Sequence, residues 1–91
     1  MDVQQAVKKA KDQIVLLFTT EGADSIGLEE VDRDEVTHDW LVTIGFSRPW
    51  DKPGNVIAAI SGPVRRVYKV VRIKENTEEV ISVKDRDLAR T

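Results

Sequence analysis

One stretch of the chain decides its fold: Trp40-Leu41-Val42-Thr43-Ile44-Gly45-Phe46-Ser47. Large apolar residues alternate here with smaller or more polar ones, so that Trp40, Val42, Ile44 and Phe46 share one face. A period of two is typical of a β-strand that buries one of its sides. The stretch therefore predicts a strand over residues 40–47, and its apolar face needs a cover.

The cover is expected to be an amphipathic helix at the N-terminus, over about residues 2–19. Apolar residues recur there at intervals of three and four, with lysines and other polar residues on the opposite side; the apolar stripe comprises Val3, Ala6, Val7, Ala10, Ile14, Leu17 and Phe18. A stripe of this width favours a helix that lies on a sheet. Asp2 is expected to cap the first turn, and Gly22 to end the helix in the left-handed conformation.

Three further strands are predicted, over about residues 28–32, 64–74 and 79–84. Residues 23–27 are expected to form a connector between the helix and the first strand. The strand connections are short enough for antiparallel neighbours. The sequence therefore predicts one α+β domain over residues 1–91, with the N-terminal helix packed on a four-stranded antiparallel meander sheet.

An irregular loop is predicted over residues 48–63, because prolines and a Pro-Gly pair interrupt regular pairing. The apolar run Val56-Ile57-Ala58-Ala59-Ile60 inside it fits either a helical turn or an extended segment, since five residues do not separate the two. Trp50 has two interpretations as well. Its ring either folds back on the core or stands out as an anchor for a partner.

Composition limits the class of protein. A chain of 91 residues has room for one core, and without cysteine it has neither disulfides nor a thiolate metal site. Neither a signal peptide nor an apolar run of about 20 residues occurs, so we expect a soluble cytoplasmic protein with no membrane contact. The formal net charge of -2 argues against a nucleic-acid binder that relies on global charge.

The charges are unevenly distributed along the chain. Residues 21–39 are strongly acidic, whereas residues 64–74 hold no acid and carry five basic side chains: Arg65, Arg66, Lys69, Arg72 and Lys74. Segments of opposite sign within one domain can complement each other across a sheet surface. The alternative is a patch of one sign that faces a partner.

The residues indicate no catalytic or metal site. His38 is the single histidine, and none of the serines lies in a G-x-S-x-G turn. His38 with Asp34, Glu35 and Asp39 matches neither an EF-hand loop nor a zinc motif. The chain is therefore predicted to be no enzyme, with no catalytic residue, no metal and no cofactor, and with a dispensable His38.

One pattern resembles a known family. The strand Val67-Tyr68-Lys69-Val70-Val71-Arg72-Ile73, followed by Thr77-Glu78-Glu79-Val80-Ile81-Ser82-Val83, is similar to the PepSY-type pattern in which a "Y-x-V" strand turns into a "T-G-E-V" hairpin. Glu78 occupies the position of the glycine, and residues 48–63 are an insertion relative to the short form. The order of elements also resembles cystatin-like rolls. The PepSY-type resemblance implies a noncatalytic inhibitory or binding module.

We therefore expect a small noncatalytic protein-interaction or regulatory module that binds another protein or a second copy of itself. Tryptophan and arginine dominate binding hot spots, so the candidate binding residues flank or lie in the irregular loop: Arg48, Trp50, Asp51, Lys52, Arg65 and Arg66. The alternative is a nucleic-acid-binding sheet surface that uses the basic residues 64–74. Tyr68 is the only aromatic residue there, whereas such surfaces interleave several, so nucleic acid is the disfavoured partner.

Overall fold

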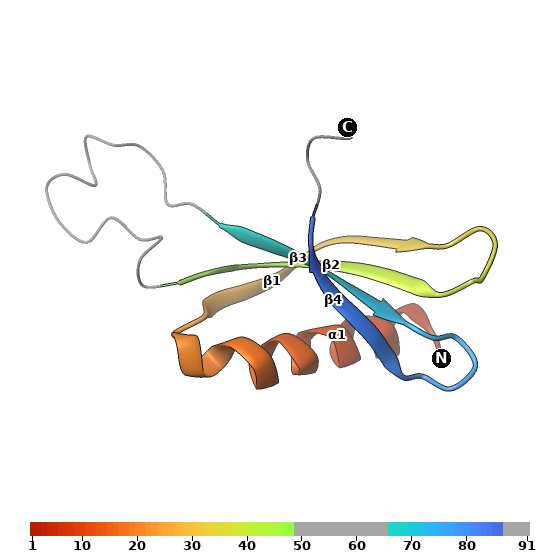
Figure 1. Ribbon diagram of the computed structural model, residues 1–91, viewed down its shortest axis with the longest axis horizontal. Helices are drawn as coiled ribbons and strands as arrows, with labels where there is room; N and C mark the ends of the chain where they lie inside the picture. Colours follow the sequence, from red (N-terminus) through yellow and green to blue (C-terminus); the bar gives the residue numbers. More distant parts are fainter. Residues whose placement is uncertain (49–65, 87–91) are drawn as a thin grey trace, which may run out of the picture.

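The fold is that of a computed structural model, which describes residues 1–48 and 66–86. The elements follow in the order α1 (Val3–Phe18), a 3-10 turn η1 (Thr19–Glu21), β1 (Asp24–Arg33), β2 (Trp40–Ser47), β3 (Val67–Ile73) and β4 (Val80–Asp85). The strands form one antiparallel sheet in the order β1-β2-β3-β4. Helix α1 lies against one face of this twisted sheet (Figure 1). The predicted α+β arrangement of one helix on a four-stranded antiparallel sheet is confirmed.

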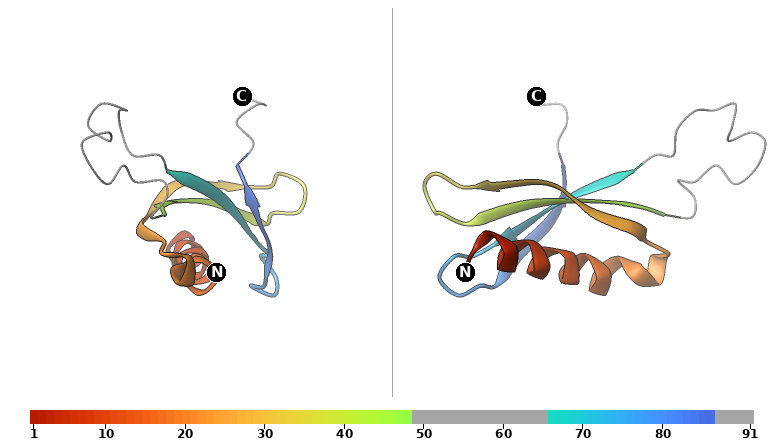
Figure 2. Two further views of the ribbon diagram at one scale, coloured as in Figure 1. Left: turned by 60° about the vertical axis from the view of Figure 1, so that its left-hand side comes forward. Right: turned by 180° about the vertical axis from the view of Figure 1, so that it is seen from behind.

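The core lies between α1 and the helix-facing side of the sheet (Figure 2). Strand β2 has the bounds that the alternation predicts, and its apolar face is buried: Val42, Ile44 and Phe46 have no exposed surface, and Trp40 is 7% exposed. Ala6, Ala10, Ile14, Val71 and Ile73 complete the buried cluster. The two alanines lie one turn apart on α1, and their small side chains let the helix approach the sheet closely.

Both predicted ends of the helical segment are confirmed. The Asp2 carboxylate accepts a hydrogen bond from the Gln5 backbone N–H, and the Gln5 side chain accepts one from the Asp2 N–H, each at 2.8 Å. This reciprocal pair satisfies two amides that a helix leaves free at its start. Gly22 follows η1 with a φ of 82°, which is the left-handed conformation that glycine adopts without strain.

Two members of the predicted helical stripe, Val3 and Leu17, do not belong to the core. Leu17 is 42% exposed, whereas its neighbour Phe18 turns inward and packs on Phe46 with ring centroids 5.1 Å apart. Because the two residues are adjacent, they point about 100° apart around the helix and cannot both face the sheet fully. The aromatic ring takes the position at the end of α1.

Strand β1 is longer than predicted, and the expected connector over residues 23–27 is wrong from Asp24 onward. The register of β1 against β2 shifts between Asp24 and Gly27 and again between Leu28 and Glu30. Ser25 has a φ of 53° at the first shift. A β-bulge inserts an extra residue and breaks the alternation by which a strand is recognised in sequence. Strand β4 is displaced by one residue from its predicted range. Strand β3 ends one residue earlier than predicted and begins at Val67, whereas the prediction began near residue 64.

The two hairpin loops repeat one geometry. In the β1–β2 loop, Asp34 N–H donates to the Asp39 carbonyl and His38 N–H to the Asp34 carbonyl, each at 2.9 Å. The β3–β4 loop makes the same bonds 40 residues later, from Lys74 to Glu79 and from Glu78 to Lys74. His38 and Glu78 therefore hold equivalent positions, with φ of 65° and 60°. Each loop needs one residue in the left-handed region.

Candidate protein-interaction site

Most of the candidate binding residues taken from the sequence fall outside the described part of the chain. These are Trp50, Asp51, Lys52 and Arg65, and the unassigned run Val56–Ile60 falls there too. Both interpretations of Trp50 stay open as predictions. Arg48 and Arg66 are described, and their neighbours can be compared.

Arg48 and Arg66 flank the same end of the β2–β3 pair but act at opposite edges of the sheet. The Arg66 guanidinium lies 2.9 Å from the Ser25 carbonyl and 3.6 Å from the Glu29 carboxylate, both on β1. The charge of Arg48 acts on Asp85 at the end of β4, where it lowers the carboxyl pKa together with the stronger effect of Lys69. The structure therefore does not gather these two arginines into one patch.

The basic side chains of β3 are divided between the two faces of the sheet. Lys69 lies on the helix-facing side, where its ammonium pairs with Asp85 and sits 5.4 Å from the centre of the Phe18 ring. Arg72 lies on the outer face and pairs with Asp34 and Asp39. The pairs that Arg72 makes, together with the Arg66–Glu29 pair, join the acidic segment to the basic one. The predicted complementation of opposite charges within the domain is confirmed.

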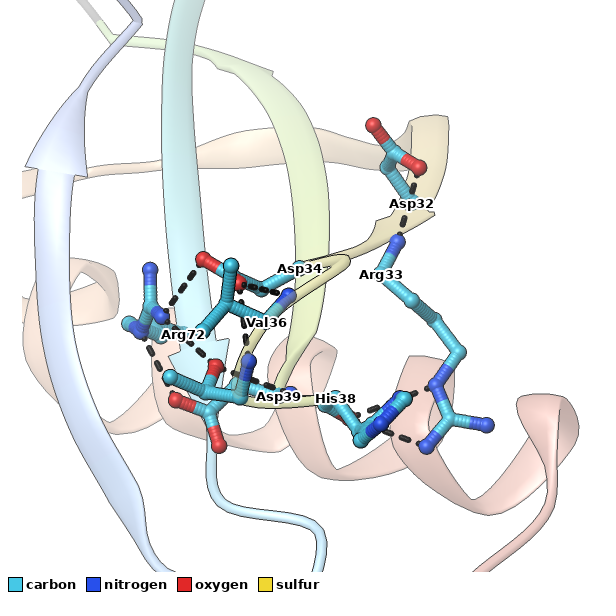
Figure 3. A network of polar contacts seen from close by, with 8 residues as sticks. Asp32, Arg33, Asp34, Val36, His38, Asp39 and Arg72 are labelled. Carbon is cyan, nitrogen blue, oxygen red and sulfur yellow. Dashed lines mark hydrogen bonds and ion pairs between the residues drawn. The ribbon is translucent and has the colours of Figure 1, made fainter.

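Arg72 is the centre of a polar network that fixes the β1–β2 loop to β3 (Figure 3). Its Nε donates to Asp39 at 2.9 Å, and its Nη2 donates to Asp34 at 2.9 Å and to the Thr37 hydroxyl at 3.0 Å. The other oxygen of Asp34 accepts the backbone N–H groups of Thr37 and Val36. These two backbone bonds and then Arg72 hold the pKa of Asp34 far below its ordinary value, because each favours the charged form.

Arg33 holds the same loop from the helix-facing side. Its guanidinium donates to the His38 carbonyl, with the shorter distance 2.9 Å, and lies 4.4 Å above the centre of the Trp40 ring. It also lies 3.0 Å from the Glu75 carboxylate in the other hairpin loop. The His38 side chain itself is exposed, and the contacts of this residue are made by its backbone. This polar region is accordingly a structural support of the hairpin.

An apolar groove runs between α1 and β1. It has a volume of about 560 Å³ and is lined by Val3, Gln4, Val7, Lys8, Lys11, Asp12, Leu28 and Val31. Val3 is 46% exposed and Leu28 is 43% exposed, so the groove keeps apolar surface in contact with solvent. A second groove, of about 440 Å³, lies on the other side of α1 next to Glu78, and most of its lining residues are polar or charged.

A β-bulge creates the apolar wall of the first groove, which we call the α1–β1 groove. Leu28 and Val31 are three positions apart, so a regular strand would direct them to opposite faces. The register shift after Leu28 changes this, because Leu28 pairs with Ile44 and Val31 pairs with Val42, two residues that face the helix. Val3 and Val7, one turn apart on α1, form the facing wall. Sequence periodicity missed this site because the bulge leaves no clear signature there.

The outer face of the sheet presents less apolar surface. Arg86 on the β4 side reaches Glu30 on β1 at 3.4 Å, over a hollow of about 190 Å³ lined by Asp32, Leu41, Thr43 and Val70. Thr43 at its centre is 5% exposed. Charged side chains that pair across the strands therefore cover this face.

Comparisons with known proteins add no relative, since no family model, no curated protein and no solved structure matches the chain. None of the helices in the described part has the length and apolar character that a membrane crossing requires. In residues 1–48 and 66–86, no three His, Asp or Glu side chains are grouped so that they could hold a metal ion. The function is therefore inferred from the geometry described above.

Proposed function

We propose that this domain is a small noncatalytic protein-interaction module and that its partner binds in the α1–β1 groove. The observation that carries the proposal is the convergence of Leu28 and Val31 with Val3 and Val7 in one solvent-accessible groove. Apolar surface that is hollowed and rimmed by polar side chains is typical of a binding site. The lysines and the aspartate along α1 supply such a rim.

The α1–β1 groove is not the site that the sequence favours, which consists of residues in and beside the irregular loop 48–63. The groove does not include Arg48 or Arg66, and Arg66 already contacts Ser25 and Glu29. Val36, at 86% exposed, is the most exposed of the large apolar residues in the described ranges, but it protrudes from the β1–β2 loop. A protruding side chain offers a partner one contact, whereas the groove offers two apolar walls.

The PepSY-type resemblance agrees with a binding role. The conformation of Glu78, with φ of 60°, is one that favours glycine, and the family pattern has its glycine at this position. The nucleic-acid alternative has less support. Arg66, Lys69 and Arg72 each pair with a carboxylate, which a phosphate would have to displace.

Selection from displayed peptide libraries tests the proposal. Selected peptides, titrated into the ¹⁵N-labelled domain, are expected to shift the amide signals of α1 and of residues 28–31. Leu28→Lys places a charge on one wall and should weaken binding at least tenfold. Val36→Lys makes the same change at an exposed apolar residue outside the groove and should leave binding unchanged.

Val3→Lys on the facing wall provides a second variant, and circular dichroism should report native helix content for each protein. The proposal is wrong if the selected peptides shift only signals outside the groove. It is also wrong if well-folded Leu28→Lys and Val3→Lys proteins bind them with unchanged affinity.

A further inference from the structure

We propose that the partner segment bound in the α1–β1 groove is an amphipathic α-helix with a carboxylate beside its apolar face. This inference rests on the proposed function and specifies the chemistry of the partner. It follows from three features of the groove: the irregular edge of β1, the spacing of the residues on α1, and the charge of Lys11.

The first feature disfavours an extended partner. A segment that adds to a sheet edge needs an uninterrupted row of free N–H and C=O groups. Strand β1 is an edge strand, but its register shifts between Asp24 and Gly27 and between Leu28 and Glu30. The second bulge lies beside the groove, between Leu28 and Val31. An added strand would lose its register at the point where its side chains should enter.

The second feature fits a helix. Val3, Val7 and Lys11 line the groove at intervals of four residues along α1. At 1.5 Å per residue this row is about 12 Å long, or a little over two turns. A partner helix with apolar residues at i, i+3 or i+4, and i+7 presents a stripe of about 10 Å, which matches that length. Ridges with a spacing of four residues are also the ones that pack most often between helices.

The third feature selects the charge of the partner. Lys8 and Asp12, which also line the groove, pair with each other at 2.8 Å. Lys11 forms no ion pair in the described part of the chain, and its side chain is partly buried. The groove therefore carries one uncompensated positive charge in a chain of net charge -2. A carboxylate on the partner complements this charge, and such complementarity contributes to specificity and to the association rate.

Two displayed libraries of equal size separate helical from extended partners. One presents randomised residues on a stable helix, and the other consists of linear peptides with a central proline, which prevents a continuous helix. Binders that shift the amide signals of residues 3–12 and 28–31 are expected from the helical library. They should carry Asp or Glu next to their apolar stripe.

Two charge reversals on α1 test the role of Lys11. Lys11→Glu should lower the affinity of these binders for the domain at least fivefold. It should raise the affinity of binder variants in which the acidic residue is replaced by Lys. Lys9→Glu, on the same helix but lining the other groove, should change neither affinity. This pair of variants separates local charge from a change in net charge.

The outcomes distinguish this inference from the proposed function. The inference of a helical, acidic partner is wrong if the groove binders come mainly from the proline library. It is also wrong if these binders tolerate Lys11→Glu as well as Lys9→Glu. In both cases the proposal of a protein-interaction module that binds in the groove is unaffected. If neither library yields a binder that shifts groove signals, both are overturned.

Discussion

Arg72 and Asp34 are 38 positions apart in the chain, and their side chains are joined by a hydrogen bond of 2.9 Å. Arg72 lies on β3, whereas Asp34 begins the loop between β1 and β2. The loop already closes through its own backbone bonds. The Arg72 network therefore adds a side-chain link between the β1–β2 loop and the third strand.

The first prediction concerns this link. Arg72→Met should lower the urea midpoint of unfolding, because Asp34 and the buried Asp39 lose their charged donor. Lys84→Met is a matched control, since Lys84 is an exposed residue of β4 whose neighbour across the strands is Val70. Equal midpoints for the two variants would show that the network contributes nothing to stability.

The second prediction is a dependence on pH. The folded-state pKa of Asp34 lies below the ordinary value of 3.8, so the charged carboxylate stabilises the fold above that pH. This contribution is lost as the pH falls below about 4 towards the folded-state pKa. Asp34→Asn, which keeps an acceptor oxygen for the loop N–H groups, should be less stable at pH 7.

Thermal unfolding of Asp34→Asn and of the unmodified protein between pH 7 and pH 2 measures the effect. The difference in melting temperature should be constant above pH 5 and should shrink below pH 4. Glu35→Gln, a neutralised exposed carboxylate in the same loop, is the control. A difference that stays the same down to pH 2 would mean that the charge of Asp34 is not involved.

The third prediction separates two positions of α1. Ile14→Ala should lower the free energy of unfolding by about 2–5 kcal/mol, because Ile14 is completely buried. Leu17→Ala should cost less than about 1 kcal/mol, since Leu17 is 42% exposed. Denaturation in urea gives both values, and Ile44→Ala on β2 should match the larger one. Equal losses for Ile14 and Leu17 would mean that the helix is rotated relative to the described packing.

The fourth prediction concerns the left-handed residue of the β3–β4 loop. Glu78→Gly should raise the free energy of unfolding by up to about 1 kcal/mol, because glycine adopts a positive φ without the clash of a side chain. Glu79→Gly, one position later, should destabilise the protein, because that residue gains no such relief. Urea denaturation compares the two, and a destabilised Glu78→Gly would contradict the loop conformation.

The fifth prediction concerns the close approach of Arg66 and Glu29 to β2. A Cβ atom on Gly45 would lie 2.6 Å from the Glu29 carboxylate and 3.2 Å from the Arg66 guanidinium. Gly45→Ala should therefore displace this ion pair and lower the melting temperature. Gly27→Ala meets nothing closer than 3.8 Å and should be tolerated better. The double variant Gly45→Ala with Glu29→Ala should recover part of the melting temperature that Gly45→Ala loses. If it recovers none, the proposed clash with Glu29 is wrong.

The sequence alone determined the architecture of this domain. The alternation in residues 40–47 and the helical stripe from Val3 to Phe18 each require a buried partner, and the two satisfy each other. Asp2 and Gly22 mark the ends of the helical segment through local backbone chemistry, which depends on few neighbours. Such features are readable because periodicity and capping are properties of short stretches.

The tertiary structure decided where the candidate site lies. Leu28 and Val31 line one groove only because a bulge shifts the register of β1 against β2. A bulge depends on how two strands pair rather than on one stretch of residues. The partners of Arg66 and Arg72 likewise follow from the pairing of the strands, which brings the acidic and basic segments together across the sheet. Lys69 meets Asp85 because the two residues are opposite each other in the β3–β4 register. Contacts between residues far apart in the chain have no local pattern, so only the folded arrangement determines them.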